Sequence, residues 1–224
     1  MRPKTQLFML ISVDGKISTG DSDFMDFDQD LPKISGAKEG LQQYYDIEKT
    51  TDVNSFNTGR VMAKIGFNDP KKKVDKISCN FIIADNSHLT SSGVENLSKR
   101  VMKLYLATNN KNHPAYKMDS DNLVILEYTD SSDLFDKLGS QYKMKRLTVQ
   151  SGGNVNAELA RSGLIDKLSI VVAPVIVGGR NTASLIDGES LHEISELSKI
   201  KALELLKVTK LKNSYLYLEY KVLN

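Results

Sequence analysis

The chain has 224 residues, which is long enough for one large domain with a substantial core. Its 30 basic and 28 acidic residues give a net charge of +2, too weak to indicate binding to nucleic acid or an acidic membrane. A single cysteine, Cys79, excludes an internal disulfide and a zinc site of several cysteines, and we expect it to be a small buried residue. Without a long apolar run or a cleavable signal pattern, the expected location is cytoplasmic.

The first half of the chain alternates apolar runs with amphipathic segments. Residues 7–13 predict a buried strand that ends at the turn signal Asp14-Gly15. Five aspartates between residues 21 and 30 resemble a calcium loop, but a loop beginning at Asp26 lacks the required Gly and Glu. We therefore favour a solvated loop or helix capping there over metal binding. Further elements expected in this half are a helix over residues 38–49, a strand over 53–56, helical turns from 61 and a strand over 79–84.

The second half continues the alternation and ends in a hairpin. Its expected elements are helical turns over residues 94–101, strands over 104–107 and 123–126, a helix over 133–142 with Leu134, Phe135 and Leu138 inward, and hairpin strands over 202–211 and 215–222. No repeat or linker interrupts the chain. We predict a single α/β domain over residues 1–224, with helices on both faces of a mixed, mainly parallel sheet and a C-terminal antiparallel hairpin.

A βαβ unit within residues 146–179 organises the chain. An apolar strand over residues 147–149 breaks at Ser151-Gly152-Gly153 and restarts as a short helix with Val155, Leu159 and Ala160 inward. Gly163 is the expected C-cap of this helix. The next strand is expected over residues 168–177, interrupted by Pro174.

The glycine pair at the start of this helix suits an anion. A helix amino end presents unpaired N–H groups and a partial positive charge, and Gly152 and Gly153 leave access to them. Asn154 is expected to act as N-cap or to donate a further hydrogen bond. A nucleotide phosphate is the natural occupant, although a tight turn explains the pair equally well and neither common nucleotide-binding fingerprint is present. A similar junction at residues 58–60 suits a second anionic group, unless Arg60 is only an exposed charge.

Polar strand ends indicate a binding site more clearly than the histidines do. His88, His113 and His192 lie far apart on expected loops, none beside a nucleophile in a recognisable motif, so a hydrolase triad is not expected. In open α/β sheets, ligands bind beyond the carboxyl ends of the strands. Strands in this chain end in small or polar residues at 12–14, 57–59, 108 and 150–154.

Three ordered motifs resemble the carboxy-terminal reductase domain of bacterial riboflavin-biosynthesis deaminase/reductases. They are S-V-D-G-K-I at residues 12–17, V-Q-S-G-G-N-V-N at 149–156, and G-L-I-D at 163–166 followed by A-P-V-I-V-G-G at 173–179. The resemblance implies a dihydrofolate-reductase-like, three-layer α/β/α fold. It also implies reduction of the ribose of an aminopyrimidine ribose phosphate with NADPH, by a protein that commonly forms homodimers. No deaminase zinc motif occurs in this chain.

The same resemblance implies roles for individual residues. Those expected to cradle the cofactor phosphates are Ser151, Gly152, Gly153, Asn154 and Val155. Those expected to lie along the cofactor are Leu10, Ser12, Thr58, Gly59 and Thr108. Ser22 and Phe24 look like the family's S-x-W pair, with Phe24 replacing the tryptophan that covers the nicotinamide and Ser22 on the substrate side.

Departures from the family pattern fall mainly on the substrate side. Gln150 replaces a glutamate and cannot carry charge, and Glu48 stands where an arginine is expected. Arg60 and Lys64 replace a threonine and an aspartate, and either cation suits a sugar phosphate. Asp14 is the first candidate for the proton donor, directly or through water, although it can equally serve only to fix its turn; Gln150 would orient the acceptor.

Three functions are compatible with these observations. The first is an NADPH-dependent reductase of a pyrimidine ribosylamino phosphate. The second is an NAD(P)H-dependent reductase of another small acceptor, such as a pterin or dihydrofolate, which the departures favour. The third is a non-catalytic nucleotide-binding module. The terminal hairpin is a possible homodimer interface, although a packed core edge would explain its apolar residues equally well. The preference for NADPH over NADH is not visible as a motif.

Overall fold

The computed structural model describes residues 1–223, and their contacts form two compact units. Unit 1 comprises residues 1–4 and 52–151, and unit 2 comprises residues 5–51 and the chain from 152 onward. The single domain expected over residues 1–224 stays a prediction. Among residues 1–223, no helix combines the length and the apolarity needed to cross a bilayer.

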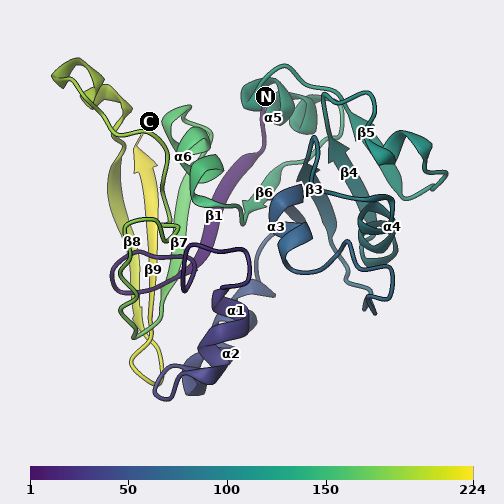
Figure 1. Cartoon of the computed structure of the whole chain (residues 1–224). Helices are drawn as coiled ribbons and strands as arrows, with labels where there is room; N and C mark the ends of the chain where they lie inside the picture. Colours follow the sequence, from purple (N-terminus) through teal and green to yellow (C-terminus); the bar gives the residue numbers. More distant parts are fainter. Residues whose placement is uncertain (224) are drawn as a thin grey trace. The chain divides into compact units, whose positions relative to one another are not determined.

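Unit 1 contains five parallel strands in the order β5-β4-β3-β2-β6 (Figure 1). The strands are β2 (Asn54–Thr58), β3 (Asn80–Ala84), β4 (Lys103–Ala107), β5 (Leu123–Leu126) and β6 (Arg146–Val149). The helices are α3 (Gly59–Lys64), α4 (Ser91–Arg100), the 3₁₀ helix η3 (Pro114–Lys117) and α5 (Ser131–Ser140). Because parallel strands need crossover connections, a helical segment lies between each strand and the next along the chain.

Alternating side chains of the unit 1 strands pack on opposite faces. Leu104 and Leu106 of β4 are fully buried in a cluster with Leu97 of α4. Tyr105, between them, points to the other face and packs edge-on against Tyr142, with ring centroids 5.1 Å apart. The three residues of α5 expected to face inward, Leu134, Phe135 and Leu138, are buried as predicted.

Unit 2 contains strands in the order β1-β7-β9-β8. The strands are β1 (Lys4–Ile11), whose first residue belongs to unit 1, β7 (Lys167–Val172), β8 (Ala202–Lys210) and β9 (Leu216–Leu223). β1 and β7 are parallel, whereas β7–β9 and β8–β9 are antiparallel. The helical segments are α1 (Phe27–Asp30), η1 (Leu31–Lys33), η2 (Lys38–Gly40), α2 (Gln42–Glu48), α6 (Gly153–Arg161) and η4 (Ile194–Lys199). The predicted mixed, mainly parallel sheet and C-terminal hairpin are confirmed.

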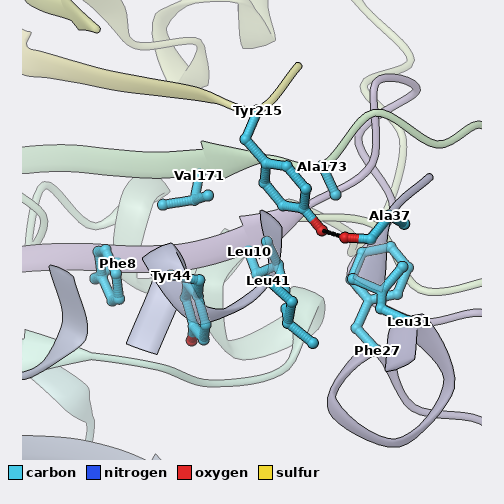
Figure 2. Packing of buried hydrophobic residues seen from close by; sticks show 10 residues of the cluster. All are labelled: Phe8, Leu10, Phe27, Leu31, Ala37, Leu41, Tyr44, Val171, Ala173 and Tyr215. Carbon is cyan, nitrogen blue, oxygen red and sulfur yellow. Dashed lines mark hydrogen bonds between the residues drawn. The ribbon is translucent and has the colours of Figure 1, made fainter. Parts of the chain in front are cut away.

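The core of unit 2 is built around aromatic residues from distant parts of the chain (Figure 2). Phe8 of β1 stacks on Tyr44 of α2 with ring centroids 5.2 Å apart. Tyr215, at the end of the hairpin turn, is fully buried, and its hydroxyl donates to the Ala37 carbonyl at 2.7 Å. Because a buried hydroxyl needs a partner, this bond fixes the loop before η2 against the hairpin.

Two aspartates cap α1 and hold the loop that precedes it, as the helix-capping interpretation predicted. Asp26 is the N-cap of α1 and accepts from the Asp28 N–H at 2.9 Å. Asp30 accepts from the Thr19 hydroxyl and the Asp26 N–H.

Three expectations about the elements were wrong in detail. The strand expected over residues 168–177 ends at Val172, because Pro174 has no N–H to continue the ladder. The helix expected over residues 38–49 is divided at Gly40, against which Tyr215 packs so closely that a Cβ would lie 2.4 Å from its ring. Cys79 lies one residue before β3 and is only partly buried.

The inward face of α6 also differs from the expectation. Its buried residues are Gly153, Asn156, Ala157 and Leu159, whereas Val155 and Ala160 are partly exposed. The Asn156 side chain donates to the Leu185 carbonyl at 2.9 Å, so a polar side chain holds a loop on this face. Gly163 adopts φ +68° just after the C-cap Ser162, in agreement with its expected role.

Candidate active site

Among residues 1–223, no side chain caps the amino end of α6 in unit 2. Gly152 is the N-cap residue, with φ −71° and ψ 157°, and its carbonyl accepts the first helical hydrogen bond, from Asn156, at 3.0 Å. A Cβ added to Gly152 would meet no atom of the described residues within 4 Å. Asn154 is the second helical residue and exposed, so the prediction that it acts as N-cap was wrong. The open space beside Gly152 fits an anion such as a phosphate.

The second glycine is required by packing within unit 2. A Cβ on Gly153 would lie 2.2 Å from Asp187 Oδ2 and 2.3 Å from the Ser184 carbonyl oxygen. The Asp187 N–H donates to the Gly153 carbonyl at 3.0 Å, and the Asp187 carboxylate accepts from the Ser184 N–H. The two glycines therefore have different roles. Gly153 allows the 184–187 loop to pack against α6, and Gly152 leaves the amino end of the helix open.

Asp14 anchors a second loop of unit 2. Its carboxylate accepts from the Ser12 hydroxyl at 2.6 Å, from the Val177 N–H at 3.1 Å and from the Gly178 N–H at 2.6 Å. These three bonds, that from Ser12 first, lower the pKa of Asp14 to about 2. Asp14 is therefore ionised at neutral pH and has no proton of its own to donate. Its role in proton transfer stays a prediction and requires a water molecule.

The other predicted residues of unit 2 differ in exposure. Leu10 is buried in the core of the unit. Phe24 is 93% exposed on the loop before α1, and Ser22 on the same loop is exposed and accepts from the Met25 N–H at 3.1 Å. An exposed aromatic side chain of this size is the type that covers a planar ligand.

Unit 1 places its predicted residues at the carboxyl ends of β2 and β4. Thr58 is the N-cap of α3, and its hydroxyl accepts from the Val61 N–H at 3.4 Å. Arg60 is exposed and Lys64 is partly buried; a spacing of four residues puts both on one face of α3. Thr108 is fully buried, and its hydroxyl donates to Asn86 Oδ1 at 3.0 Å.

Gln150 and Ser151 follow β6 at the same edge of the unit 1 sheet. The Gln150 N–H donates to the Phe56 carbonyl at 2.9 Å, which extends the β6–β2 pairing by one residue. Ser151 is buried, and the next residue of the chain is Gly152. The predicted residues thus divide between the units, with Thr58, Gly59, Arg60, Lys64, Thr108, Gln150 and Ser151 on unit 1 and Leu10, Ser12, Asp14, Ser22, Phe24, Gly152, Gly153, Asn154 and Val155 on unit 2.

A buried aspartate with two histidine partners was missed from the sequence. Asp85, directly after β3, lies 3.0 Å from His88 Nδ1 and 3.0 Å from His113 Nε2. The expectation that these histidines lie far apart was therefore wrong, because neighbouring parallel strands bring their following loops together. Burial raises the pKa of Asp85, but hydrogen bonds, that from His113 first, outweigh it and the net pKa is lowered. The D-x-x-H spacing after an apolar strand was the available signal.

Within residues 1–223, no group of three or more acidic, histidine or cysteine side chains is arranged to hold a metal ion.

Comparison with known proteins decides the family. A model of the RibD C-terminal domain matches residues 3–217, nearly the whole chain. The chain belongs to the RibD C-terminal domain family. The predicted family is thereby confirmed, and the S-V-D-G-K-I and V-Q-S-G-G-N-V-N motifs both lie inside the matched range.

Individual relatives of this RibD C-terminal domain agree with that assignment. The 2,5-diamino-6-ribosylamino-4(3H)-pyrimidinone 5′-phosphate reductase of Methanothermobacter thermautotrophicus is 24% identical over 210 residues, covering 90% of this chain and 91% of the relative. The Acinetobacter baumannii RibD structure has a TM-score of 0.70 at 14% identity, over 100% of this chain and 59% of that one. An Enterococcus faecalis dihydrofolate reductase complexed with NADP(H) has a TM-score of 0.52 at 11% identity, over 99% and 97%. These structures confirm the dihydrofolate-reductase-like fold.

Proposed function

We propose that this protein is an NADPH-dependent reductase of a pyrimidine ribosylamino 5′-phosphate, in the riboflavin pathway. Support for the reaction class comes from the family and from a reductase relative that aligns over nearly its full length. The observation that carries the cofactor proposal is the uncapped amino end of α6, with open space beside Gly152.

The residues at this helix end fit the phosphates of a dinucleotide. The backbone N–H groups of Gly153, Asn154 and Val155 lie in the first turn of α6, where a helix has unpaired donors and a partial positive charge. With Ser151 and Gly152 they would hold the phosphates. Leu10, Ser12, Thr58, Gly59 and Thr108 are proposed to line the remainder of the cofactor, and Phe24 to cover the nicotinamide. When bound, the nicotinamide supplies a hydride for reduction of the sugar.

The substrate residues are proposed from charge and hydrogen-bonding capacity. Arg60 and Lys64 are the cations suited to a 5′-phosphate, and Ser22 and the amide of Gln150 would orient the sugar. Reduction of the sugar carbon also requires a proton on the neighbouring oxygen or nitrogen. Asp14 is ionised, so we propose that it orients a water molecule that delivers this proton.

A direct assay tests the reaction. NADPH oxidation is followed with the pyrimidine ribosylamino phosphate and, in parallel, with dihydrofolate, and the product is identified by mass. We expect saturable oxidation with the first acceptor and a ribityl product two hydrogens heavier. Turnover of dihydrofolate alone would replace this function with that of another reductase, and binding of NADPH without turnover of any acceptor would leave a nucleotide-binding module.

The departures from the family pattern at the substrate side favour the alternative function, an NAD(P)H-dependent reductase of another small acceptor. Gln150 is uncharged where the family has a glutamate, and Glu48, at the end of α2, is negative where an arginine is expected. If Glu48 excludes the phosphorylated sugar, Glu48→Arg should lower the KM of the phosphorylated acceptor. Glu39→Arg, a control at another glutamate of unit 2, should leave this KM unchanged.

We also propose a homodimer formed through β8, in the cytoplasm. β8 is the edge strand of unit 2 and pairs only with β9 among the described strands of this unit. Four of its apolar side chains are between 44% and 58% exposed: Leu203, Leu205, Leu206 and Val208. An apolar edge strand of this kind is a site for pairing with a second copy.

Sedimentation velocity tests the dimer. We expect the wild type to sediment as a dimer and the double variant Leu205→Lys, Val208→Lys as a monomer. Met102→Lys changes a side chain of similar exposure, 49%, on unit 1 and should leave the dimer intact. A monomeric wild type, or a double variant that still dimerises, would contradict the proposed interface.

A further inference from the structure

Asp85 is a buried carboxylate that organises its own loop in unit 1. It directly follows β3 and is only 3% exposed. Oδ1 accepts from the His88 N–H at 3.0 Å, and Oδ2 accepts from the Leu89 N–H at 2.8 Å. A buried carboxylate needs several donors to offset the loss of hydration, and the backbone turn after β3 provides two of them.

The loop after β4 provides another donor. His113 is fully buried, and its Nε2 lies 3.0 Å from Asp85 Oδ2. Its Nδ1 accepts from the Ala115 N–H at 3.1 Å, so the proton of the neutral ring is on Nε2, which donates to Asp85. The ring therefore bridges the Asp85 turn and the first turn of η3.

The same aspartate also supports the junction after β2. A Cβ on Gly59 would lie 2.2 Å from Asp85 Cγ, so the carboxyl group packs directly against the first residue of α3. The next residue, Asn86, accepts from the Thr108 hydroxyl at 3.0 Å and from the Asn109 N–H at 2.8 Å. Asp85 and Asn86 thus connect the carboxyl ends of three neighbouring parallel strands, β2, β3 and β4.

We infer that Asp85 and His113 are positioning residues for the nicotinamide cofactor. Asp85 packs directly against Gly59, and the neighbouring Asn86 holds Thr108; both Gly59 and Thr108 belong to the proposed cofactor site. The polar atoms of Asp85 and His113 are themselves used within the cluster. This inference rests on the proposed function. Because hydrogen bonds to a buried charge are directional, loss of the His113 donor lets the three loops shift relative to one another and weakens cofactor binding more than it changes turnover at saturation.

A matched pair of substitutions at His113 tests the inference. His113→Gln keeps a donor and an acceptor, whereas His113→Phe keeps the volume and removes both. Calorimetric titration with NADPH should give a Kd about tenfold higher for the phenylalanine variant, the effect of one lost hydrogen bond, and within about twofold for the glutamine variant. The KM for NADPH should follow the Kd while kcat stays near the wild-type value. His192→Phe, at an exposed histidine of unit 2, is the control and should change nothing.

Failure of the inference can be told from failure of the proposed function. A wild type that binds no nicotinamide nucleotide removes the proposed function itself. A wild type that binds NADPH while a folded His113→Phe protein binds it equally tightly overturns only the positioning role. Equal weakening by both substitutions at His113 would overturn it as well, because the hydrogen bonds would then be irrelevant.

A measurement on the wild type covers the case in which His113→Phe does not fold. Because coupling between two sites is reciprocal, cofactor binding must stabilise the cluster if the cluster favours binding. Saturating NADPH should therefore slow hydrogen exchange of the Leu89 and Ala115 amides, which donate to Asp85 and His113. Unchanged exchange of both amides in the NADPH-bound protein would overturn the inference.

Discussion

Replacement of Gly153 by alanine should destabilise unit 2, although alanine normally stabilises a helix. The added Cβ would lie 2.2 Å from Asp187 Oδ2 and 2.3 Å from the Ser184 carbonyl oxygen. The carboxylate can rotate away, but the carbonyl belongs to a loop held by backbone hydrogen bonds from Ile17 to Ala183 and from Leu185 to Gly15. Relief of the clash therefore requires backbone movement.

The size of the effect follows from two opposing contributions. Overpacking of a fitted contact costs about 1–3 kcal/mol, and a Gly-to-Ala change in a helix returns about 0.5–1 kcal/mol. We expect a net loss of about 1–2 kcal/mol in the free energy of unfolding, or a fall of roughly 2–8 °C in Tm for a chain of this size. Gly152→Ala is the matched control, because its Cβ would meet no atom of residues 1–223 within 4 Å; replacing this N-cap glycine by alanine should cost about 0.5 kcal/mol, less than the clash at Gly153.

Urea unfolding followed by circular dichroism measures both variants under one condition. The loss caused by Gly153→Ala should shrink in an Asp187→Ala background, since one of the two clashing groups is then absent. A Gly153→Ala protein as stable as Gly152→Ala would refute the reasoning, because the 184–187 loop would then not be packed on α6 as described.

Two further predictions concern unit 2. Asp14→Asn should weaken the hydrogen bonds that hold the Val177 and Gly178 backbone N–H groups. Because the pKa of Asp14 is lowered to about 2 in the folded protein, the stability that the Asp14 carboxylate contributes is present above the pKa of about 4 of an unfolded aspartate and declines as the pH falls toward 2. Unfolding of wild type and variant between pH 6 and pH 2 should therefore show a difference that narrows with acid, and a constant difference would contradict the anchoring role. Tyr215→Phe leaves the Ala37 carbonyl without its 2.7 Å donor and should cost about 1 kcal/mol by urea unfolding, whereas no loss would show that solvent replaces the hydroxyl.

The strands and the fold class were predictable because they depend on local pattern. Apolar runs located β3 and β4 to within one residue, and the alternation beyond residue 202 located the hairpin. The break in the helix expected over residues 38–49 was not predictable in the same way. At this point Tyr215, from the far end of the chain, packs against Gly40, and no local pattern reveals that contact.

In the candidate site, too, some features follow from the local sequence and others from contacts between residues far apart in the chain. The glycine turn was visible as a strand followed by Gly152-Gly153, but the reason for Gly153 lies with Asp187, in a loop more than 30 residues later. Asp85 and His113 are 28 residues apart and meet only because β3 and β4 are parallel neighbours. A sequence shows which strand ends carry polar residues, whereas the strand order decides which of them meet.

The most direct test of the central claim is a calorimetric titration of NADPH into the wild type and into Gly152→Val. Valine is compatible with the φ of −71° and ψ of 157° at this position, and its Cβ would meet no atom of residues 1–223 within 4 Å, so the variant should fold with only the modest loss that follows from replacing an N-cap glycine. Its side chain would occupy the space proposed for the cofactor phosphates. We predict binding to the wild type and its loss in the variant. NADPH binding of equal affinity to both proteins would contradict a cofactor site at the amino end of α6.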